Sequence, residues 1–261
     1  WAWREKRAQK IGRSADLVLC LFPMEPPIYA RYGIDARFVG HPLARAFPLH
    51  SDRAAARREL ALPANGPVLA VLPGSRLGEI HRLGRTFAQA AALVAREIPQ
   101  SHIVAPMANA ACRDAFAAII ADDPETAARF ALIDGRAHTV MAAADAILLA
   151  SGTAALEAML AKRPMVVGYR VAPASYFIAR LLRMLKTDVY SLPNILGGRR
   201  LVPELMQDAC TAPALAQPLL AILRERSTNE QTVAEFERIH RDLLGDADHD
   251  AATAVADLIT R

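Results

Sequence analysis

Short apolar runs alternate with longer amphipathic or alanine-rich stretches along most of the chain. The run from Val68 to Leu72 is continuously apolar, which is typical of a strand buried on both faces of a parallel sheet. The stretches between such runs have the spacing of helices that bury one face. Strands are predicted at residues 16–22, 37–40, 68–72, 102–106, 130–133, 146–149 and 165–169. Helices are predicted at residues 4–14, 27–32, 53–60, 78–97, 110–121, 137–143 and 153–162. This alternation predicts an α/β fold with a parallel sheet.

Two features divide this pattern. The stretch from His41 to Asp52 interrupts both periods with Pro42 and Pro48, and it is the only candidate hinge. From Pro203 onward the chain shows only helical periodicity, with an amphipathic run at residues 228–244. We therefore predict three parts. They are residues 1–45 as the end of one α/β domain, 46–200 as a nearly whole second α/β domain, and 201–261 as a helical tail.

The overall charge is modest, but its distribution along the chain is uneven. The net charge of +4 is too small to predict a nucleic-acid partner. Between Lys162 and Arg200 there are eight basic residues and one acidic residue, whereas residues 201–261 hold eleven acids and five bases. This asymmetry indicates a surface that faces an anionic ligand or a membrane.

Cysteine usage and hydropathy narrow the class of protein. The three cysteines are far apart and form no CxxC pair, so neither a disulfide framework nor a metal site is predicted, and a reducing cytoplasm fits. No apolar run reaches the roughly 20 residues of a membrane-spanning helix. Because the chain begins with Trp1 and the first residues read as the middle of an element, we expect a fragment that lacks its natural N-terminus.

The predicted strand at residues 68–72 leads into the sequence Pro-Gly-Ser-Arg and then a helix. At the carboxyl edge of an α/β sheet such a turn is a place where ligands bind. Gly74 allows close approach of the backbone, Ser75 offers a hydroxyl and Arg76 can bind phosphoryl oxygens beside the helix N-terminus. The same residues also suit a plain turn with a helix cap, so this motif alone decides nothing.

A second turn of this kind follows the strand at residues 146–149. Ser151, Gly152 and Thr153 open the next helix, and Glu157 lies one helical turn after Thr153. A carboxylate there can accept hydrogen bonds from a vicinal diol such as ribose, although a capped helix with an acidic first turn is the simpler alternative. Two such turns in one domain together predict a nucleoside diphosphate site at the carboxyl edge of the sheet.

Further candidates lie in the basic region. Tyr169 and Arg170 end a predicted strand and could contact an anionic ligand, and Asn194 follows a proline that fixes the chain. The stretch from Ser175 to Lys186 combines apolar and basic side chains, which is typical of a helix at a membrane interface, but an interior helix with one basic edge fits equally. The predicted membrane or acyl contacts are Phe177, Ile178, Arg180, Leu181, Arg183 and Lys186.

With these segments in place, the sequence closely resembles the lipid-A-disaccharide synthase family of GT-B glycosyltransferases. The resemblance runs through WAWREKR, FVGHPL, LPGSRLGEI, LLASGTAALEAMLAKRPMVVGYR, LKTDVYSLPN and LVPEL. It implies the end of an N-terminal Rossmann-like acceptor domain followed by a UDP-sugar-binding Rossmann-like domain. It also implies a reaction that moves 2,3-diacylglucosamine from UDP to 2,3-diacylglucosamine 1-phosphate (lipid X), which gives the β-1,6-linked disaccharide 1-phosphate and UDP.

The resemblance also assigns roles to the residues named above. Gly74, Ser75, Arg76, Gly152 and Thr153 would hold the leaving diphosphate, Glu157 the ribose, and Asn194, Tyr169 and Arg170 would complete the nucleotide site. No metal and no cofactor beyond the substrate nucleotide is implied. In the family the general base belongs to the N-terminal domain and would precede Trp1, so we expect no transferase activity from this fragment by itself.

The family further implies where the protein works. We expect a cytoplasmic protein bound peripherally to the inner face of the inner membrane, in contact with anionic lipid, and a homodimer. Two other readings stay open on the residues alone. One is another UDP-sugar enzyme of GT-B shape, such as a UDP-N-acetylglucosamine epimerase or a peptidoglycan-precursor transferase. The other is a non-catalytic module that binds a nucleotide or lipid.

Overall fold

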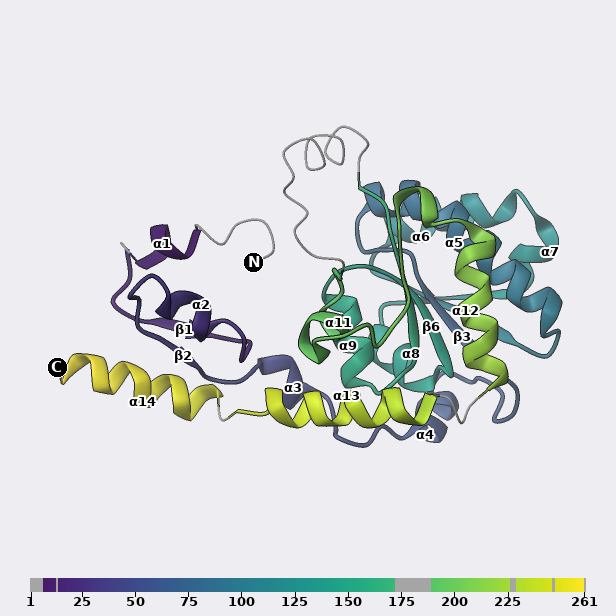
Figure 1. The fold of residues 1–261 in the computed structure, drawn as a ribbon. Helices are drawn as coiled ribbons and strands as arrows, with labels where there is room; N and C mark the ends of the chain where they lie inside the picture. The colour runs from purple at the N-terminus through teal and green to yellow at the C-terminus, as the bar shows by residue number, and fades with distance from the viewer. Residues whose placement is uncertain (1–6, 13, 172–188, 226–228, 246, 261) are drawn as a thin grey trace. The chain divides into compact units, whose positions relative to one another are not determined.

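The computed structural model describes residues 7–12, 14–171, 189–225, 229–245 and 247–260. The chain forms two compact units (Figure 1). Unit 1 comprises residues 1–49, 172–188 and 237–261, and unit 2 comprises residues 50–171 and 189–236. The three-part division predicted from the sequence stays a prediction. Among the described residues, no helix has both the length and the apolar character needed to cross a membrane.

Unit 2 is built on a six-stranded parallel sheet in the order β5-β4-β3-β6-β7-β8. The strands are β3 (Val68–Leu72), β4 (His102–Met107), β5 (Phe130–Asp134), β6 (Ala146–Ala150), β7 (Met165–Tyr169) and β8 (Glu204–Met206). Every residue of β3 and β6 is buried, because helices cover both faces of the sheet. This arrangement confirms the α/β fold with a parallel sheet.

One face of the sheet packs against α5 (Leu77–Glu97), α6 (Ala110–Ala121) and α12 (Ala212–Arg224). Leu69, Val71, Ile103 and Leu148 point into this layer and bury their side chains against it. The other face packs against α8 (Ala137–Ala143) and α9 (Thr153–Leu160), with α4 (Arg53–Glu59) and α11 (Leu192–Gly197) beyond them. Figure 1 shows these layers on either side of the strands. The short α7 (Pro124–Ala127) follows α6.

The expectation of a purely helical tail after Pro203 is wrong at its start. Glu204–Met206 form β8, which extends the sheet beside β7, and Gln207–Ala209 form a 3-10 turn before α12. The strand is only three residues long and has an acidic first residue, so it carries no hydrophobic period that a sequence pattern could detect. The remaining tail is helical, with α13 (Glu230–Leu243) and α14 (Ala247–Ile259).

Unit 1 contains the parallel pair β1 (Val18–Cys20) and β2 (Ala36–Phe38), with α1 (Arg7–Gly12) and α2 (Pro26–Ala30). Its small core gathers around Ala8, Cys20 and Tyr29. The C-terminal segment joins this unit where the His41 N–H donates to the Leu243 carbonyl at 3.0 Å, just before α3 (Pro42–Ala46).

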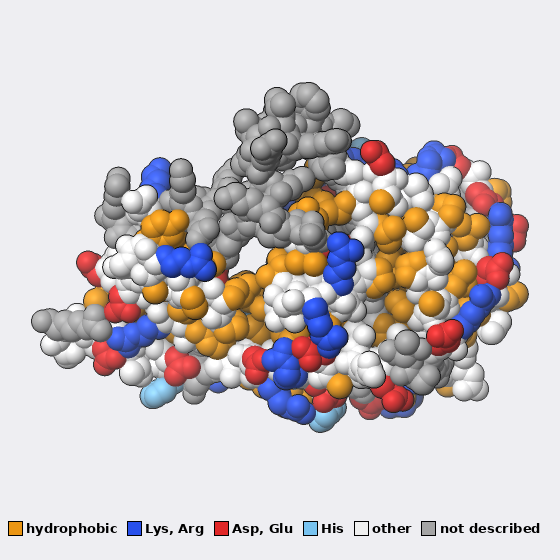
Figure 2. Space-filling view, viewed as in Figure 1, with side chains coloured by type: hydrophobic (Ala, Val, Ile, Leu, Met, Phe, Trp, Pro, Cys, Tyr) orange, Lys and Arg blue, Asp and Glu red, His pale blue; other side chains and the backbone are white. Residues whose placement is uncertain are grey.

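The surface of unit 2 carries both signs of charge. In Figure 2, acidic and basic side chains are interspersed along its edge at the right of the view. Two of the ion pairs that this unit forms are Arg85 with Asp122 at 2.5 Å and Arg224 with Glu97 at 2.7 Å. All four side chains are more than half exposed, so these pairs add little to stability.

Candidate functional site

The strand order of unit 2 reverses between β3 and β6. The chain runs outward from β3 through β4 to β5, and then returns to the other side of β3 through β6 to β7 and β8. The two connections that leave β3 and β6 therefore diverge to opposite faces of the sheet, and a crevice opens between them at the carboxyl ends of the strands. A cavity of about 580 Å³ lies at this place.

The cavity brings together seven of the nine residues predicted to bind the nucleotide. They are Gly74, Ser75, Arg76, Gly152, Thr153, Glu157 and Tyr169. The turn after β3, the start of α9 and the end of β7 supply them. Residues that sequence reasoning did not select also line it, among them Glu79 and Arg136.

The turn between β3 and α5 depends on a glycine. Gly74 has φ +134°, and a Cβ atom there would lie 2.4 Å from the Glu79 Cβ and 2.5 Å from its Oε2 atom. Glu79 needs this space because its Oε2 atom accepts the backbone N–H groups of Ser75 at 2.8 Å and Arg76 at 3.3 Å. The carboxylate thus caps α5, and a glutamate three residues after the cap position is the sequence signal that could have identified it.

The Arg76 side chain is 83% exposed, with its guanidinium 3.6 Å from the Glu79 carboxylate. An exposed guanidinium at the mouth of a cavity can bind phosphoryl oxygens in a bidentate manner. A second arginine, Arg136, also lines the cavity from the start of α8, in the left-handed conformation at φ +54°. Its guanidinium pairs with Glu59 of α4.

The start of α9 presents unused hydrogen-bond donors. Within the part of the chain that the structure describes, the backbone N–H groups of Thr153 and Ala154 have no acceptor, and a Cβ atom added to Gly152 would meet nothing within 4 Å. Open space in front of free N–H groups, at the positive end of a helix dipole, is an arrangement that binds anions.

Glu157 lies one turn further along α9 and lines the same cavity. Burial raises the pKa of its carboxyl group, and the nearby His138 imidazole partly offsets the shift. The two side chains approach to 3.7 Å between Glu157 Oε2 and His138 Nε2. A half-buried carboxylate at this depth can accept hydrogen bonds from ligand hydroxyl groups.

Two predicted residues do not reach the cavity. Arg170 donates instead to the Cys210 carbonyl oxygen. Asn194 is fully buried, and its amide donates to the Val202 carbonyl at 2.9 Å and to Glu204 Oε1 at 2.8 Å. The Asn194 Oδ1 atom also accepts two backbone N–H groups, so all its hydrogen-bonding capacity is used within the protein. In this structure Asn194 therefore organises the chain before β8 and does not line the cavity.

The six predicted membrane or acyl contacts lie outside the described residues. They are Phe177, Ile178, Arg180, Leu181, Arg183 and Lys186.

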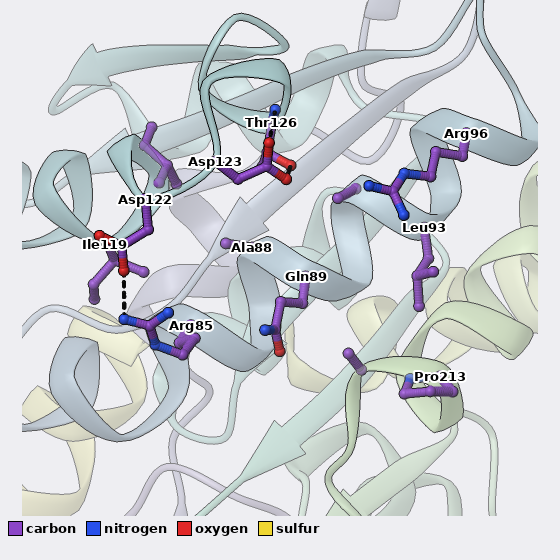
Figure 3. A pocket seen from close by; sticks show the side chains of 13 residues that line it. Arg85, Ala88, Gln89, Leu93, Arg96, Ile119, Asp122, Asp123, Thr126 and Pro213 are labelled. Carbon is purple, nitrogen blue, oxygen red and sulfur yellow. Dashed lines mark hydrogen bonds and ion pairs between the residues drawn. The ribbon is translucent and has the colours of Figure 1, made fainter.

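A second cavity, of about 480 Å³, lies on the outer face of α5 between α7 and the start of α12 (Figure 3). None of the predicted site residues lines it. Three of its four charged side chains serve the protein itself, because Arg85 pairs with Asp122 and Asp123 caps α7 through the Thr126 N–H and hydroxyl groups. The cavity at the carboxyl ends of β3 and β6 is therefore the candidate site.

Comparison with known proteins gives sequence relatives along the whole chain. The family LpxB, described as lipid-A-disaccharide synthetase, matches residues 1–256. A lipid-A-disaccharide synthase of Xanthomonas campestris pv. campestris (strain 8004) is 54% identical over 261 residues, which are 100% of this chain and 60% of that protein. One of Xylella fastidiosa (strain M23) is 52% identical over 259 residues, 99% of this chain and 67% of that protein. The chain thus spans about 60% of the length of the Xanthomonas relative.

Solved structures with much lower identity share the fold. The UDP-GlcNAc 2-epimerase from Neisseria meningitidis bound to UDP-GlcNAc matches with a TM-score of 0.59 and 11% identity, over 96% of this chain and 63% of that one. Anabaena Alr3699/HepE in complex with UDP and glucose matches with a TM-score of 0.54 and 14% identity, over 97% of this chain and 67% of that one. These likenesses support the GT-B type of α/β fold.

Proposed function

Since the chain belongs to the lipid-A-disaccharide synthase family, we propose that the protein moves a 2,3-diacylglucosamine unit from UDP onto 2,3-diacylglucosamine 1-phosphate. The products are the β-1,6-linked disaccharide 1-phosphate and UDP. The bond that breaks joins the anomeric carbon of the donor sugar to the diphosphate, and the bond that forms joins that carbon to the acceptor hydroxyl oxygen. Inversion at this carbon is consistent with a single in-line displacement.

The observation that carries this proposal is the cavity at the switch point of the sheet. It combines the two glycine-containing turns, after β3 and at the start of α9, with the Glu157 carboxylate one helical turn further along α9. A nucleoside diphosphate needs both features, since its phosphates are anionic and its ribose carries a vicinal diol. A free lipid or a neutral sugar would not require two such turns.

Departure of the diphosphate concentrates negative charge on the leaving oxygen. The Arg76 guanidinium, the Ser75 hydroxyl and the N–H groups at the start of α9 are placed to meet that charge as it develops. Preorganised donors of this kind stabilise a transition state because they need not reorganise during the reaction. These residues act on the donor side of the reaction.

Glu157 is proposed to orient the nucleotide. Its carboxylate accepts hydrogen bonds from the ribose hydroxyls when it is ionised, and it thereby fixes the direction in which the diphosphate points. Tyr169, at the end of β7, lines the same cavity and adds a polar contact with an aromatic face.

The family also leads us to propose that the protein works at the cytoplasmic face of the inner membrane, bound peripherally, and that it forms a homodimer. The support for membrane contact is the sequence from Ser175 to Lys186, in which basic and apolar side chains alternate in the manner of interfacial helices. Both proposed substrates carry acyl chains, so access from a membrane surface fits their chemistry.

Titration with UDP tests the nucleotide site directly. We expect Arg76→Ala to weaken UDP binding by about tenfold and to leave uridine binding unchanged, because only the charge-assisted contacts to phosphate are lost. Glu157→Ala should weaken both ligands. Arg96→Ala is the matched control, since Arg96 lies on the same helix α5 but lines the second cavity. Unchanged UDP affinity in both site variants would refute the assignment.

The reaction itself is tested with the protein expressed from its complete gene. Disaccharide formation from the diacylated UDP-glucosamine, and none from UDP-N-acetylglucosamine, is the expected result. Turnover of the unacylated nucleotide sugar would favour another UDP-sugar enzyme of the same fold.

A further inference from the structure

The turn after β3 already contains a negative charge where the proposed ligand would place one. Glu79 Oε2 accepts the backbone N–H groups of Ser75 and Arg76, at 2.8 and 3.3 Å. These N–H groups are the donors that a phosphate bound at this turn would use. A phosphate there must therefore either displace the Glu79 carboxylate or bind in direct contact with it.

The surroundings of Glu79 keep its carboxylate at this place. The absence of a side chain at Gly74 leaves space for it, and the Glu79 side chain is only 22% exposed. Its Oε1 atom also lies 3.6 Å from the Arg76 guanidinium, so it offsets part of the positive charge that would attract phosphate. Both effects oppose the binding of negative charge, and both grow with the charge of the ligand.

We propose that Glu79 makes the site discriminate against the product UDP in favour of the UDP-sugar donor, which assists product release. The inference rests on the proposed function. In the donor, the terminal phosphate is esterified to the sugar. In free UDP, the terminal phosphate has a further ionisable oxygen with a pKa near 6 and so carries more negative charge at neutral pH. A fixed carboxylate therefore repels the product more strongly than the donor.

Glu79→Gln is the informative variant because it removes the charge and keeps the shape. A glutamine at this position retains an oxygen that can accept the Ser75 and Arg76 N–H groups, and glutamine is a normal partner in this type of helix cap. The turn and α5 are therefore expected to form. Glu97→Gln is the matched control, since it removes the same charge from the last turn of the same helix, where Glu97 pairs with Arg224.

The first test is calorimetric titration of the purified protein with UDP and with UDP-N-acetylglucosamine at pH 8. At contact distance, we expect Glu79→Gln to tighten UDP about tenfold and UDP-N-acetylglucosamine about threefold or less. Glu97→Gln should leave both affinities within about twofold of the wild type. Equal tightening of the two ligands, or weaker UDP binding, would overturn the proposal.

The second test uses turnover by the protein expressed from its complete gene. Added UDP should inhibit Glu79→Gln disaccharide synthesis at about tenfold lower concentration than it inhibits the wild type. A role confined to capping α5 would lower stability and leave the ratio of product to donor affinity unchanged.

These outcomes separate the inference from the proposed function. Suppose that Arg76→Ala weakens UDP binding but Glu79→Gln does not change the ratio of the affinities for UDP and the UDP-sugar. The nucleotide site is then supported and the proposed role of Glu79 is refuted. If the wild-type protein binds neither nucleotide, the proposed nucleotide site and the role of Glu79 are both refuted.

Discussion

Asp145 provides the sharpest test of how burial decides the strength of an ion pair in this fold. Its carboxylate lies just before β6 and contacts Arg57 and Arg53 at 2.5 Å each. It also accepts the Val68 N–H at 2.8 Å, which links β6 to the first residue of β3. The side chains of Asp145 and Arg57 are 7% and 6% exposed. The perturbation is Asp145→Asn, which removes the charge while it keeps the size and one acceptor oxygen.

The expected cost follows from the charges that stay behind. Arg57 keeps its hydrogen bonds to the carbonyl groups of Ala143, Ala64 and Gly66, but its buried guanidinium loses its counter-ion. Arg163 is nearby, and burial, together with repulsion from Arg53 and Arg57, lowers its pKa to about 10 while Asp145 opposes that shift. Removal of one partner of a buried pair costs about 3–5 kcal/mol.

Asp122→Asn is the matched control. Asp122 pairs with Arg85 at the same 2.5 Å distance, but the two side chains are 55% and 62% exposed. An exposed pair contributes about 0–1 kcal/mol. The two variants therefore remove the same charge at the same distance, and they differ in burial and in the number of groups that the carboxylate contacts.

Urea unfolding followed by far-ultraviolet circular dichroism measures both variants. Circular dichroism is used because both tryptophans, Trp1 and Trp3, lie outside the residues that the structure describes. With an m-value of about 2–3 kcal/mol per molar, Asp145→Asn should lower the midpoint by roughly 1–2 M, and Asp122→Asn by less than about 0.5 M. Equal shifts in the two variants would refute the argument from burial.

Two further predictions concern the site and unit 1. Because burial raises the pKa of Glu157, its ionised form is lost at a higher pH than for an ordinary glutamate. The affinity for UDP-N-acetylglucosamine should therefore fall as the pH drops toward that raised pKa. The Glu157→Gln variant should bind more weakly, with an affinity that does not change over the same pH range. A wild-type affinity that is independent of pH would contradict this prediction. In Gly245→Ala, the new Cβ would lie 2.8 Å from the Gly40 Cα and the Val39 carbonyl oxygen, so we expect a loss of about 1–3 kcal/mol. The measurement is hydrogen exchange at the His41 N–H, which bonds to Leu243 and should exchange faster in the variant. An unchanged exchange rate would contradict this prediction.

Most of the fold could be predicted because its strongest signals are local. The predicted strand at residues 68–72 and the predicted helices at 110–121 and 137–143 match the structure residue for residue. Each of these elements has one dominant period and ends at a turn or cap. The two turns that we propose to bind phosphate are also local features, since glycine, hydroxyl and helix start are consecutive in the sequence. That both turns lie at the switch point follows from the order β4-β3-β6, which single motifs do not encode.

The bonds that Asp145 and Asn194 form depend on partners outside their own sequence motifs. The sequence around Asp145 gives no sign of its role, yet its carboxylate accepts the Val68 N–H and pairs with two arginines of α4, all more than seventy residues earlier. Asn194 was predicted to contact the nucleotide, and its oxygen and nitrogen atoms are used by residues 201–204. The residue types at these positions indicate hydrogen-bonding capacity, but only the folded chain decides which groups use that capacity.

Several bases of the region between residues 162 and 200 are also engaged within the protein. Its local charge predicted a surface for an anionic ligand or membrane, yet three of its bases serve the interior of unit 2. Lys162 is 5% exposed and donates to the Leu160 carbonyl, and Arg163 donates to the Ala142 carbonyl. Arg170 likewise donates to the backbone carbonyl of Cys210. A count of charges along the sequence therefore overstates the positive field at the surface, because a buried guanidinium or ammonium bonded to carbonyl oxygens cannot also bind a ligand.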